Sequence, residues 1–385
     1  MTVNSPKGFR AAGVAAGIKE SGDKDVTLVV NDGPLDVAAG VFTRNKVKAA
    51  PVLWSQQVLA TGRVKAVVLN SGGANACTGP EGFQDTHATA EHVAETLGIG
   101  AIDVAVCSTG LIGAHLPMDN LKAGITSAAE RLADTTAAGV DAATAVMTTD
   151  TVPKHAESVQ DGWALGGFAK GAGMCAPNMA TMLSVITTDA VLEQSDVDAA
   201  LRRAVAVTFN ALDVDGGTST NDTVLLLCSG ASGREVPVEE FTEQLTGLCR
   251  DLVAQLQADA EGVTKHVTVT VRGAVSDAEA AVVARTVARD NLCKTAFFGS
   301  DPNWGRVAMA VGNAPVEFDP AELDITINGI VLCEKGAAGE DRSKADLSGR
   351  DITVVVDLHA GPGSATVLTT DLSHGYVEEN SAYSS

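Results

Sequence analysis

Short runs rich in β-branched and other apolar residues recur along the chain and predict strands. These runs are Val26–Val30, Val64–Leu69, Val104–Cys107, Leu183–Thr188, Thr223–Cys228, Val267–Val271 and Ile352–Leu358. Two segments between the runs show apolar residues at helical spacing, which predicts amphipathic helices. They are Met118, Leu121, Ile125, Ala128 and Leu132 in the first segment, and Phe241, Leu245, Leu248, Leu252 and Leu256 in the second.

A third helix is indicated by its start. Ser276 followed by Glu279 is a capping box, which predicts a helix over Asp277–Arg289. Helices and strands that alternate in this way are typical of layered α/β or α+β proteins. The segment Val152–Met174 contains Pro153 and several glycines and has little periodicity, so we interpret it as a candidate domain boundary.

Composition and charge narrow the classes of function. The chain has 385 residues, 45% of them hydrophobic, which is enough for a sizeable core in one large domain or in two to three smaller ones. With 27 Lys+Arg against 48 Asp+Glu, the net charge is −21. This argues against nucleic-acid and anionic-membrane partners, which require clustered Lys and Arg.

Cysteine usage and hydropathy indicate the compartment. The seven cysteines are odd in number and widely spaced, and no CxxC occurs, so we expect neither a disulfide framework nor a zinc site. The apolar stretch from Ala11 to Ile18 is short, and no run approaches the roughly 18 residues of a membrane span. We therefore expect a cytoplasmic, reduced protein that is not bound to a membrane.

The most unusual stretch runs from Lys170 to Leu183, with the sequence KGAGMCAPNMATML. Glycines and a proline predict an irregular backbone that passes into a strand near Thr181. An Ala180–Thr181 junction at such a point is a candidate for self-cleavage. The threonine hydroxyl would attack the preceding carbonyl, and hydrolysis of the resulting ester would leave Thr181 as a new N-terminus. Its α-amine could then activate its hydroxyl as a nucleophile. A threonine that merely begins a strand is the alternative.

This stretch resembles the KG(S/A)GM-x-x-PNMAT signature of the ornithine acetyltransferases, also called glutamate N-acetyltransferases. Other stretches resemble the same family in chain order: Phe9–Val14, Ala38–Thr43, Asn70–Gly79, Ser108–Gly113, Met147–Thr151, Phe209–Asp215 and Ser300–Arg306. The resemblance covers nearly the whole chain. It implies an α/β fold of layered sheets and helices, of the self-processing N-terminal-nucleophile type.

The resemblance implies ping-pong acetyl transfer in arginine biosynthesis. Thr181 would take the acetyl group from N-acetylornithine, ornithine would leave, and glutamate would receive the acetyl group. The family's oxyanion donors fall on Thr109 and Gly110, which suits the tetrahedral oxyanion of acyl transfer. No metal or organic cofactor is implied, because the acetyl group travels on Thr181. Whether acetyl-CoA is a second donor stays open.

The family's substrate contacts fall on Thr148, Lys170, Glu261, Asn380 and Ser385. Thr149 is a close rival of Thr148 in register. A lysine ammonium suits a substrate carboxylate, and the carboxylate of Glu261 could hold the ornithine side-chain ammonium. Without the resemblance, Lys170 and Glu261 would be interpreted as solvated surface residues, and the polar C-terminal tail as frayed.

Three other features have structural interpretations. The glycine-rich loop Gly72–Gly79 lacks the spacing of nucleotide-binding loops. Asp213, Asp215 and Asp222 do not fit a calcium-loop pattern and are interpreted as forming turn and structural hydrogen bonds. Cys107 has no matched histidine and is interpreted as a core residue.

The resemblance also implies processing and assembly. Residues 1–180 would form an α chain and residues 181–385 a β chain, assembled as an α2β2 heterotetramer. Two rival functions remain open from the sequence. One is a related self-processing amidase or aminopeptidase, in which water resolves the acyl-enzyme. The other is an uncleaved, non-catalytic paralogue.

Overall fold

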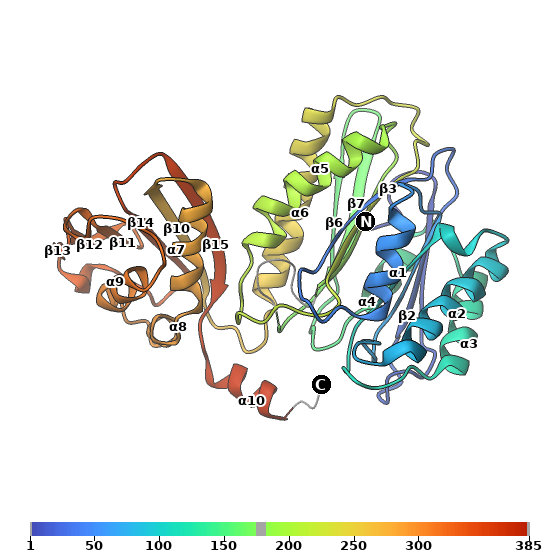
Figure 1. The fold of residues 1–385 in the computed structure, drawn as a ribbon, viewed down its shortest axis with the longest axis horizontal. Helices are drawn as coiled ribbons and strands as arrows, with labels where there is room; N and C mark the ends of the chain where they lie inside the picture. The colour runs from blue at the N-terminus through green and yellow to red at the C-terminus, as the bar shows by residue number, and fades with distance from the viewer. Residues whose placement is uncertain (1, 175–181, 383–385) are drawn as a thin grey trace. The chain divides into compact units, whose positions relative to one another are not determined.

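The computed structural model describes residues 2–174 and 182–382, which divide into two compact units (Figure 1). Unit 1 contains the described residues up to Asn210 together with Thr218–Leu256, and unit 2 contains Ala211–Gly217 and the described residues from Gln257 onward. Both units layer helices on sheets, which confirms the expected α/β class. The candidate boundary at Val152–Met174 is wrong, because this segment contains two paired strands inside unit 1.

The first sheet of unit 1 has the strand order β1-β2-β4-β5, in which only the β4–β5 pair is parallel. Its strands are β1 (Phe9–Val14), β2 (Val26–Asn31), β4 (Ala66–Asn70) and β5 (Val104–Ser108). The helices in this part of the chain are α1 (Ala50–Leu59), α2 (Gly79–Leu97), α3 (Met118–Glu130) and α4 (Thr136–Ala145). Helix α3 contacts β1 and β2, whereas α1 and α4 each contact strands of both sheets of unit 1.

The second sheet of unit 1 has the order β3-β9-β8-β7-β6, with β8 and β9 parallel. Its strands are β3 (Val37–Phe42), β6 (Lys154–Val159), β7 (Ala164–Lys170), β8 (Leu183–Thr188) and β9 (Thr223–Cys228). Helices α5 (Gln194–Val207) and α6 (Val238–Ala258) follow β8 and β9 in the chain. In the β7–β8 pair, Lys170 lies opposite Leu183. The strand that precedes the unusual stretch is therefore the neighbour of the strand that follows it.

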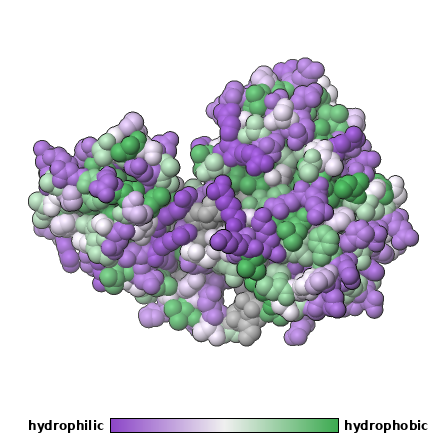
Figure 2. All heavy atoms as spheres, in the orientation of Figure 1, coloured by the Kyte–Doolittle hydropathy of each residue, from purple (hydrophilic) through white to green (hydrophobic). Residues whose placement is uncertain are grey.

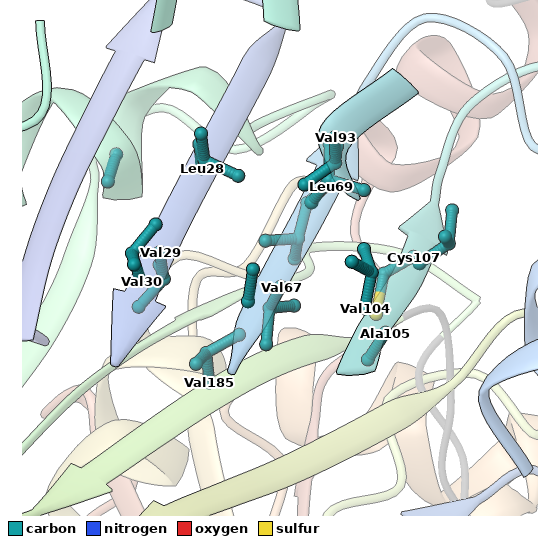
Figure 3. Packing of buried hydrophobic residues seen from close by; sticks show 14 of the residues in the cluster. Leu28, Val29, Val30, Val67, Leu69, Val93, Val104, Ala105, Cys107 and Val185 are labelled. Carbon is teal, nitrogen blue, oxygen red and sulfur yellow. The ribbon is translucent and has the colours of Figure 1, made fainter. Parts of the chain in front are cut away.

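A continuous apolar core joins the two sheets of unit 1. Figure 3 shows Val67 and Leu69 of β4 beside Val104 and Cys107 of β5, and Val185 of β8 belongs to the same buried cluster. Full burial of such side chains stabilises a fold by about 1.5–3 kcal/mol each. The shared core therefore fixes the ends of β5, β7 and β8 relative to one another.

Unit 2 is built on a six-stranded sheet of order β13-β12-β11-β14-β10-β15. Its strands are β10 (His266–Ala274), β11 (Asp324–Ile327), β12 (Ile330–Glu334), β13 (Ala337–Ala338), β14 (Asp351–Asp357) and β15 (Gly363–Thr370). Its helices are α7 (Asp277–Arg289), α8 (Asn291–Phe298), α9 (Trp304–Gly312) and α10 (His374–Ala382). Helix α7 has the predicted bounds, and the Ser276 hydroxyl caps it by accepting from the Glu279 N–H at 3.3 Å.

Hydrophilic side chains cover much of the face seen in Figure 2, with apolar side chains scattered among them. This distribution agrees with the acidic composition of the chain. None of the helices in the described ranges combines the length and hydropathy that a bilayer crossing requires.

Candidate functional site

The C-terminal end of β7 places a lysine among hydroxyl groups. Lys170 is the last residue of β7 and only 1% exposed. Its Nζ donates to Thr148 Oγ1 at 2.8 Å and to Thr109 Oγ1 at 3.3 Å. The structure therefore brings together three predicted site residues from three separate segments. Of the two threonines that are rivals in register, Thr148 and Thr149, it is Thr148 whose hydroxyl accepts from Lys170.

A buried carboxylate lies behind this cluster. Asp150 accepts from Lys154 Nζ at 2.5 Å, from the Gly171 N–H at 2.7 Å and from the Thr148 N–H at 3.0 Å. Burial acts to raise the pKa of Asp150, but Lys170, Lys154 and the Gly171 N–H together lower this pKa to about 2. Asp150 is therefore ionised at neutral pH and holds the Thr148 and Gly171 backbones in place. Lys154 is also buried. We had not predicted either residue as part of the site.

The turn after β5 holds the predicted oxyanion donors against the glycine-rich loop. Gly110 has a φ of +125°, and a Cβ placed there would lie 2.6 Å from backbone atoms of both Gly72 and Gly73. Only glycine fits this approach. Gly73 forms an isolated β-bridge with Thr109, and the Ala74 N–H donates to Leu111 O at 2.9 Å. The turn after β5 and the glycine-rich loop are therefore packed together through their backbones.

The bond from Lys170 leaves the proton of the Thr109 hydroxyl available for donation. A threonine hydroxyl carries one proton and can accept at its oxygen. Since Lys170 Nζ donates to Thr109 Oγ1, the hydroxyl proton points away from Lys170. A tetrahedral oxyanion is an acceptor of the required kind.

Met182, which directly precedes β8, is hydrogen-bonded to Asp222 and to Thr223, the first residue of β9. The Met182 N–H donates to Asp222 Oδ1 at 3.0 Å, and Met182 O accepts from the Thr223 N–H at 3.1 Å. Asp222 is completely buried. We had interpreted Asp222 as structural, and its bond to the residue after Thr181 is a relation that spacing along the chain does not reveal.

Two predicted substrate contacts meet in unit 2. Asn380 lies on α10, and its Nδ2 donates to Glu261 Oε2 at 2.9 Å and to Tyr376 O at 3.0 Å. The C-terminal segment is thus helical to Ala382 and bonded to a predicted site residue, instead of frayed.

The remaining predicted site residues lie outside the described ranges. They are Ala180 and Thr181 at the proposed cleavage point and Ser385 at the C-terminus.

The structural interpretations of Asp213, Asp215 and Cys107 are confirmed. Asp213 and Asp215 accept from the N–H groups of Gly216 and Gly217. Burial raises the pKa of Cys107 to about 12, although a hydrogen bond with Thr223 opposes this, so the thiol is neutral and packs in the core. Within the described ranges, no group of three or more His, Cys, Asp or Glu side chains is arranged to hold a metal ion.

Comparisons with known proteins extend this picture. The sequence model of the ArgJ family matches residues 10–385. The arginine biosynthesis bifunctional protein ArgJ of Mycolicibacterium paratuberculosis is 61% identical over 389 residues, covering 100% of this chain and 96% of the relative. The protein of the same description from Streptomyces coelicolor is 57% identical over 385 residues and covers 100% of both chains. A solved structure of ornithine acetyltransferase from Mycobacterium tuberculosis in complex with ornithine is 63% identical. That match covers 46% of this chain and 94% of the other, with a TM-score of 0.45.

Proposed function

The chain belongs to the ArgJ family, and from this membership we propose that it transfers an acetyl group from N-acetylornithine to glutamate through an ester on Thr181. It is then an acyltransferase of arginine biosynthesis. The observation that supports this most directly concerns Lys170, a buried residue of β7, the strand that pairs with β8. Lys170 donates to the Thr109 and Thr148 hydroxyls.

The first half-reaction forms the ester. The Thr181 hydroxyl attacks the acetyl carbonyl and gives its proton to the Thr181 α-amine, whose ordinary pKa of about 7.7–8.0 leaves part of it neutral near pH 7. The tetrahedral oxyanion is bound by the Thr109 hydroxyl and the Gly110 N–H. The carbon–nitrogen bond of the acetyl amide then breaks, and the α-ammonium returns the proton to the departing ornithine amine.

The second half-reaction reverses these roles. The glutamate α-amine attacks the ester carbonyl carbon and gives a proton to the Thr181 α-amine, while the same donors hold the second oxyanion. The ester carbon–oxygen bond then breaks, and the α-ammonium returns the proton to the Thr181 oxygen. Both half-reactions form a tetrahedral oxyanion on the acetyl carbon, so a single set of preorganised donors serves both steps.

Charged groups would select the two amino acids. Lys170 and Thr148 would hold the carboxylate common to both substrates. Glu261, with Asn380 beside it, would pair with the side-chain ammonium of ornithine. Ser385 would complete the substrate contacts from the C-terminus.

Self-cleavage between Ala180 and Thr181 would create the nucleophile, leaving chains of residues 1–180 and 181–385 that assemble as α2β2. Before cleavage the Thr181 nitrogen is an amide and cannot accept the hydroxyl proton, so cleavage would have to precede transfer.

One experiment tests cleavage and transfer together. The purified protein is incubated with N-acetylornithine, quenched rapidly in acid and analysed by intact mass spectrometry. We expect two fragments, with about 42 Da added to the fragment that begins at Thr181 by covalent catalysis. Thr181→Ala should give one full-length chain and no label. A label on any other fragment, or cleavage that survives in Thr181→Ala, would refute the proposed nucleophile.

The products separate transfer from hydrolysis. With glutamate present, acetylglutamate and ornithine should appear in equal amounts. Free acetate as the main product would instead identify an amidase, in which water resolves the ester.

A further inference from the structure

Two adjacent buried residues connect the predicted oxyanion turn to the start of β8. They are Asn221 and Asp222, which directly precede β9 and are 4% and 0% exposed. Asn221 Nδ2 donates to Ala74 O at 2.6 Å and to Ser108 O at 2.7 Å. Ala74 belongs to the glycine-rich loop, and Ser108 immediately precedes Thr109.

The side chain of Asp222 bonds to the residue that directly precedes β8. Asp222 Oδ1 accepts from the Met182 N–H. Met182 follows Thr181 in the chain, so Asp222 is bonded to the first described residue after the proposed nucleophile. Thr223 reinforces this by donating to Met182 O.

We propose that Asn221 and Asp222 are positioning residues that fix the separation between the oxyanion donors and the nucleophile. This inference rests on the proposed function. Neither side chain is assigned any contact with substrate. They act through the backbones of Ser108, Ala74 and Met182.

The physical reason lies in the geometry of acyl transfer. The attacking oxygen and the oxyanion donors must meet the same carbonyl group within a few tenths of an ångström, and an error of about 1 Å can cost on the order of 10²-fold in rate. Asn221 and Asp222 are adjacent, yet their side chains bond to different segments: Asn221 to Ala74 and Ser108, and Asp222 to Met182. One short, buried segment can therefore hold two structural elements at a fixed distance.

Both the oxygen and the nitrogen of the Asn221 side-chain amide are hydrogen-bonded. Its Oδ1 accepts from Thr220 Oγ1 at 2.5 Å, which fixes the amide so that its nitrogen faces the two carbonyl oxygens. A carboxylate at this position would face those oxygens with no proton to donate.

The bond from Asp222 to Met182 requires only an acceptor oxygen. Burial raises the pKa of Asp222 well above the ordinary value, although the Met182 N–H, Lys170 and Ser219 oppose this. An uncharged side chain with one carbonyl-type acceptor is sufficient for the bond to Met182, and asparagine provides that acceptor with the same shape.

Four variants and two matched controls test the proposal. Asn221→Leu and Asp222→Leu keep approximate volume and remove the bonds. We expect kcat to fall about 100-fold in each, with KM for N-acetylornithine within about threefold of wild type. Asp222→Asn should recover to within about fivefold of wild type, and Asn221→Asp should not recover. Rates are expressed per active site, counted from the amplitude of acetyl labelling.

The controls remove equivalent bonds elsewhere in unit 1. Asn31 is buried and donates through Nδ2 to Leu35 O at 3.0 Å and Cys228 O at 3.3 Å. Asp189 is buried and accepts from the Ala164 N–H at 2.7 Å. Asn31→Leu and Asp189→Leu should lower the melting temperature and leave kcat per active site unchanged.

The outcomes separate the two proposals. A wild-type enzyme that never acquires the acetyl label contradicts the proposed function. A labelled wild type whose Asn221→Leu and Asp222→Leu variants keep normal kcat, or lose kcat no more than the controls, overturns the positioning role alone. If the leucine variants do not fold, Asn221→Ser and Asp222→Ala decide the question, with an expected loss of about tenfold in kcat each.

Discussion

Two of the buried lysines, Lys170 of unit 1 and Lys294 of unit 2, show how similar burial can serve different purposes. Lys170 in unit 1 is 1% exposed and donates to the hydroxyls of Thr148 and Thr109. Lys294 in unit 2 is 5% exposed and donates to the carbonyl oxygens of Val214 and Thr370 and, over longer distances, to the hydroxyls of Thr369 and Thr370. Burial lowers the pKa of Lys294 to about 8, although Asp213, Asp215 and Asp371 oppose this.

The difference lies in what the acceptors can still do. The two shortest bonds of Lys294 go to carbonyl oxygens, which have no proton to offer a ligand, and the Thr369 hydroxyl already donates its proton to Ala288 O at 3.3 Å. A hydroxyl that accepts from a lysine can still donate its own proton. Lys170 therefore organises groups that remain chemically useful, whereas Lys294 joins β15 to the segment that contains Val214. The acceptor type, more than burial, distinguishes a candidate site from a structural brace.

Removing the ammonium of Lys170 should have the largest effect. We expect Lys170→Met to lower kcat/KM for N-acetylornithine by about 10³-fold, since truncating one member of a buried charged cluster costs about 2–5 kcal/mol. Steady-state kinetics on folded, cleaved protein measure this. A loss of stability without a loss of kcat/KM would remove the distinction between the two lysines.

The matching change in unit 2 should affect stability instead. Lys294→Met leaves buried carbonyl oxygens without their donor, which costs about 1–3 kcal/mol for each such group. We expect the free energy of unfolding to fall by about 3 kcal/mol in denaturant titrations, with kcat/KM within about twofold of wild type. A collapse of kcat/KM in a folded Lys294→Met enzyme would contradict the brace interpretation.

Acid should weaken the charged network around Lys170. The pKa of Asp150 is lowered from 3.8 to about 2, so its ionised form stabilises the folded state by about 2 kcal/mol above pH 4. This contribution should be lost as the pH falls from about 4 to 2. Unfolding free energies of wild type and Asp150→Asn should therefore differ most above pH 4 and converge towards pH 2. A constant difference would show that the charge is not responsible.

The smallest effect is expected at the half-exposed acid of unit 2. Glu261→Gln should raise KM for N-acetylornithine about fivefold and leave KM for glutamate nearly unchanged, because solvent-accessible ion pairs contribute about 1 kcal/mol or less. Kinetics with both substrates, together with a gel that follows chain cleavage, test this. Equal losses in cleavage and in both KM values would indicate a folding role for Glu261.

Strong local patterns allowed part of the fold to be predicted. Leu183–Thr188 and Thr223–Cys228 form strands with the bounds that their β-branched composition indicates, and Asp277–Arg289 is a helix begun by Ser276. These segments are buried on both faces or amphipathic, so composition and tertiary packing favour the same structure.

The strands β6 and β7 were missed because their residues are small or polar. Gly166 and Gly167 have low intrinsic strand propensity, and β7 is formed by pairing with neighbours on both sides. A Cβ at Gly166 would lie 2.2 Å from Thr2 O, so close approach of the N-terminal segment requires glycine there. Such a contact between distant segments leaves no periodic signal.

The candidate site likewise contains residues that the sequence predicts and residues that only the structure reveals. Thr109, Gly110, Thr148 and Lys170 could be predicted as site residues because they match family motifs. Asp150 and Lys154 form an ion pair whose importance depends on complete burial, and the bonds of Asn221 and Asp222 depend on loop packing. Neither property can be calculated from spacing along one chain.

The proposed cut falls between β7 and β8 in the chain, and this order has a thermodynamic consequence. Strands β6 and β7 precede residue 181, whereas β8 and β9 follow it, and β7 is hydrogen-bonded to β8 along its length. Once cleaved, the two polypeptides would be partners in a complex whose dissociation is unfolding. Their melting temperature would then rise with protein concentration by mass action, whereas that of an uncut precursor would not. The uncut precursor would fold in a unimolecular reaction. A denatured mature enzyme would instead have to refold by association of two separate chains.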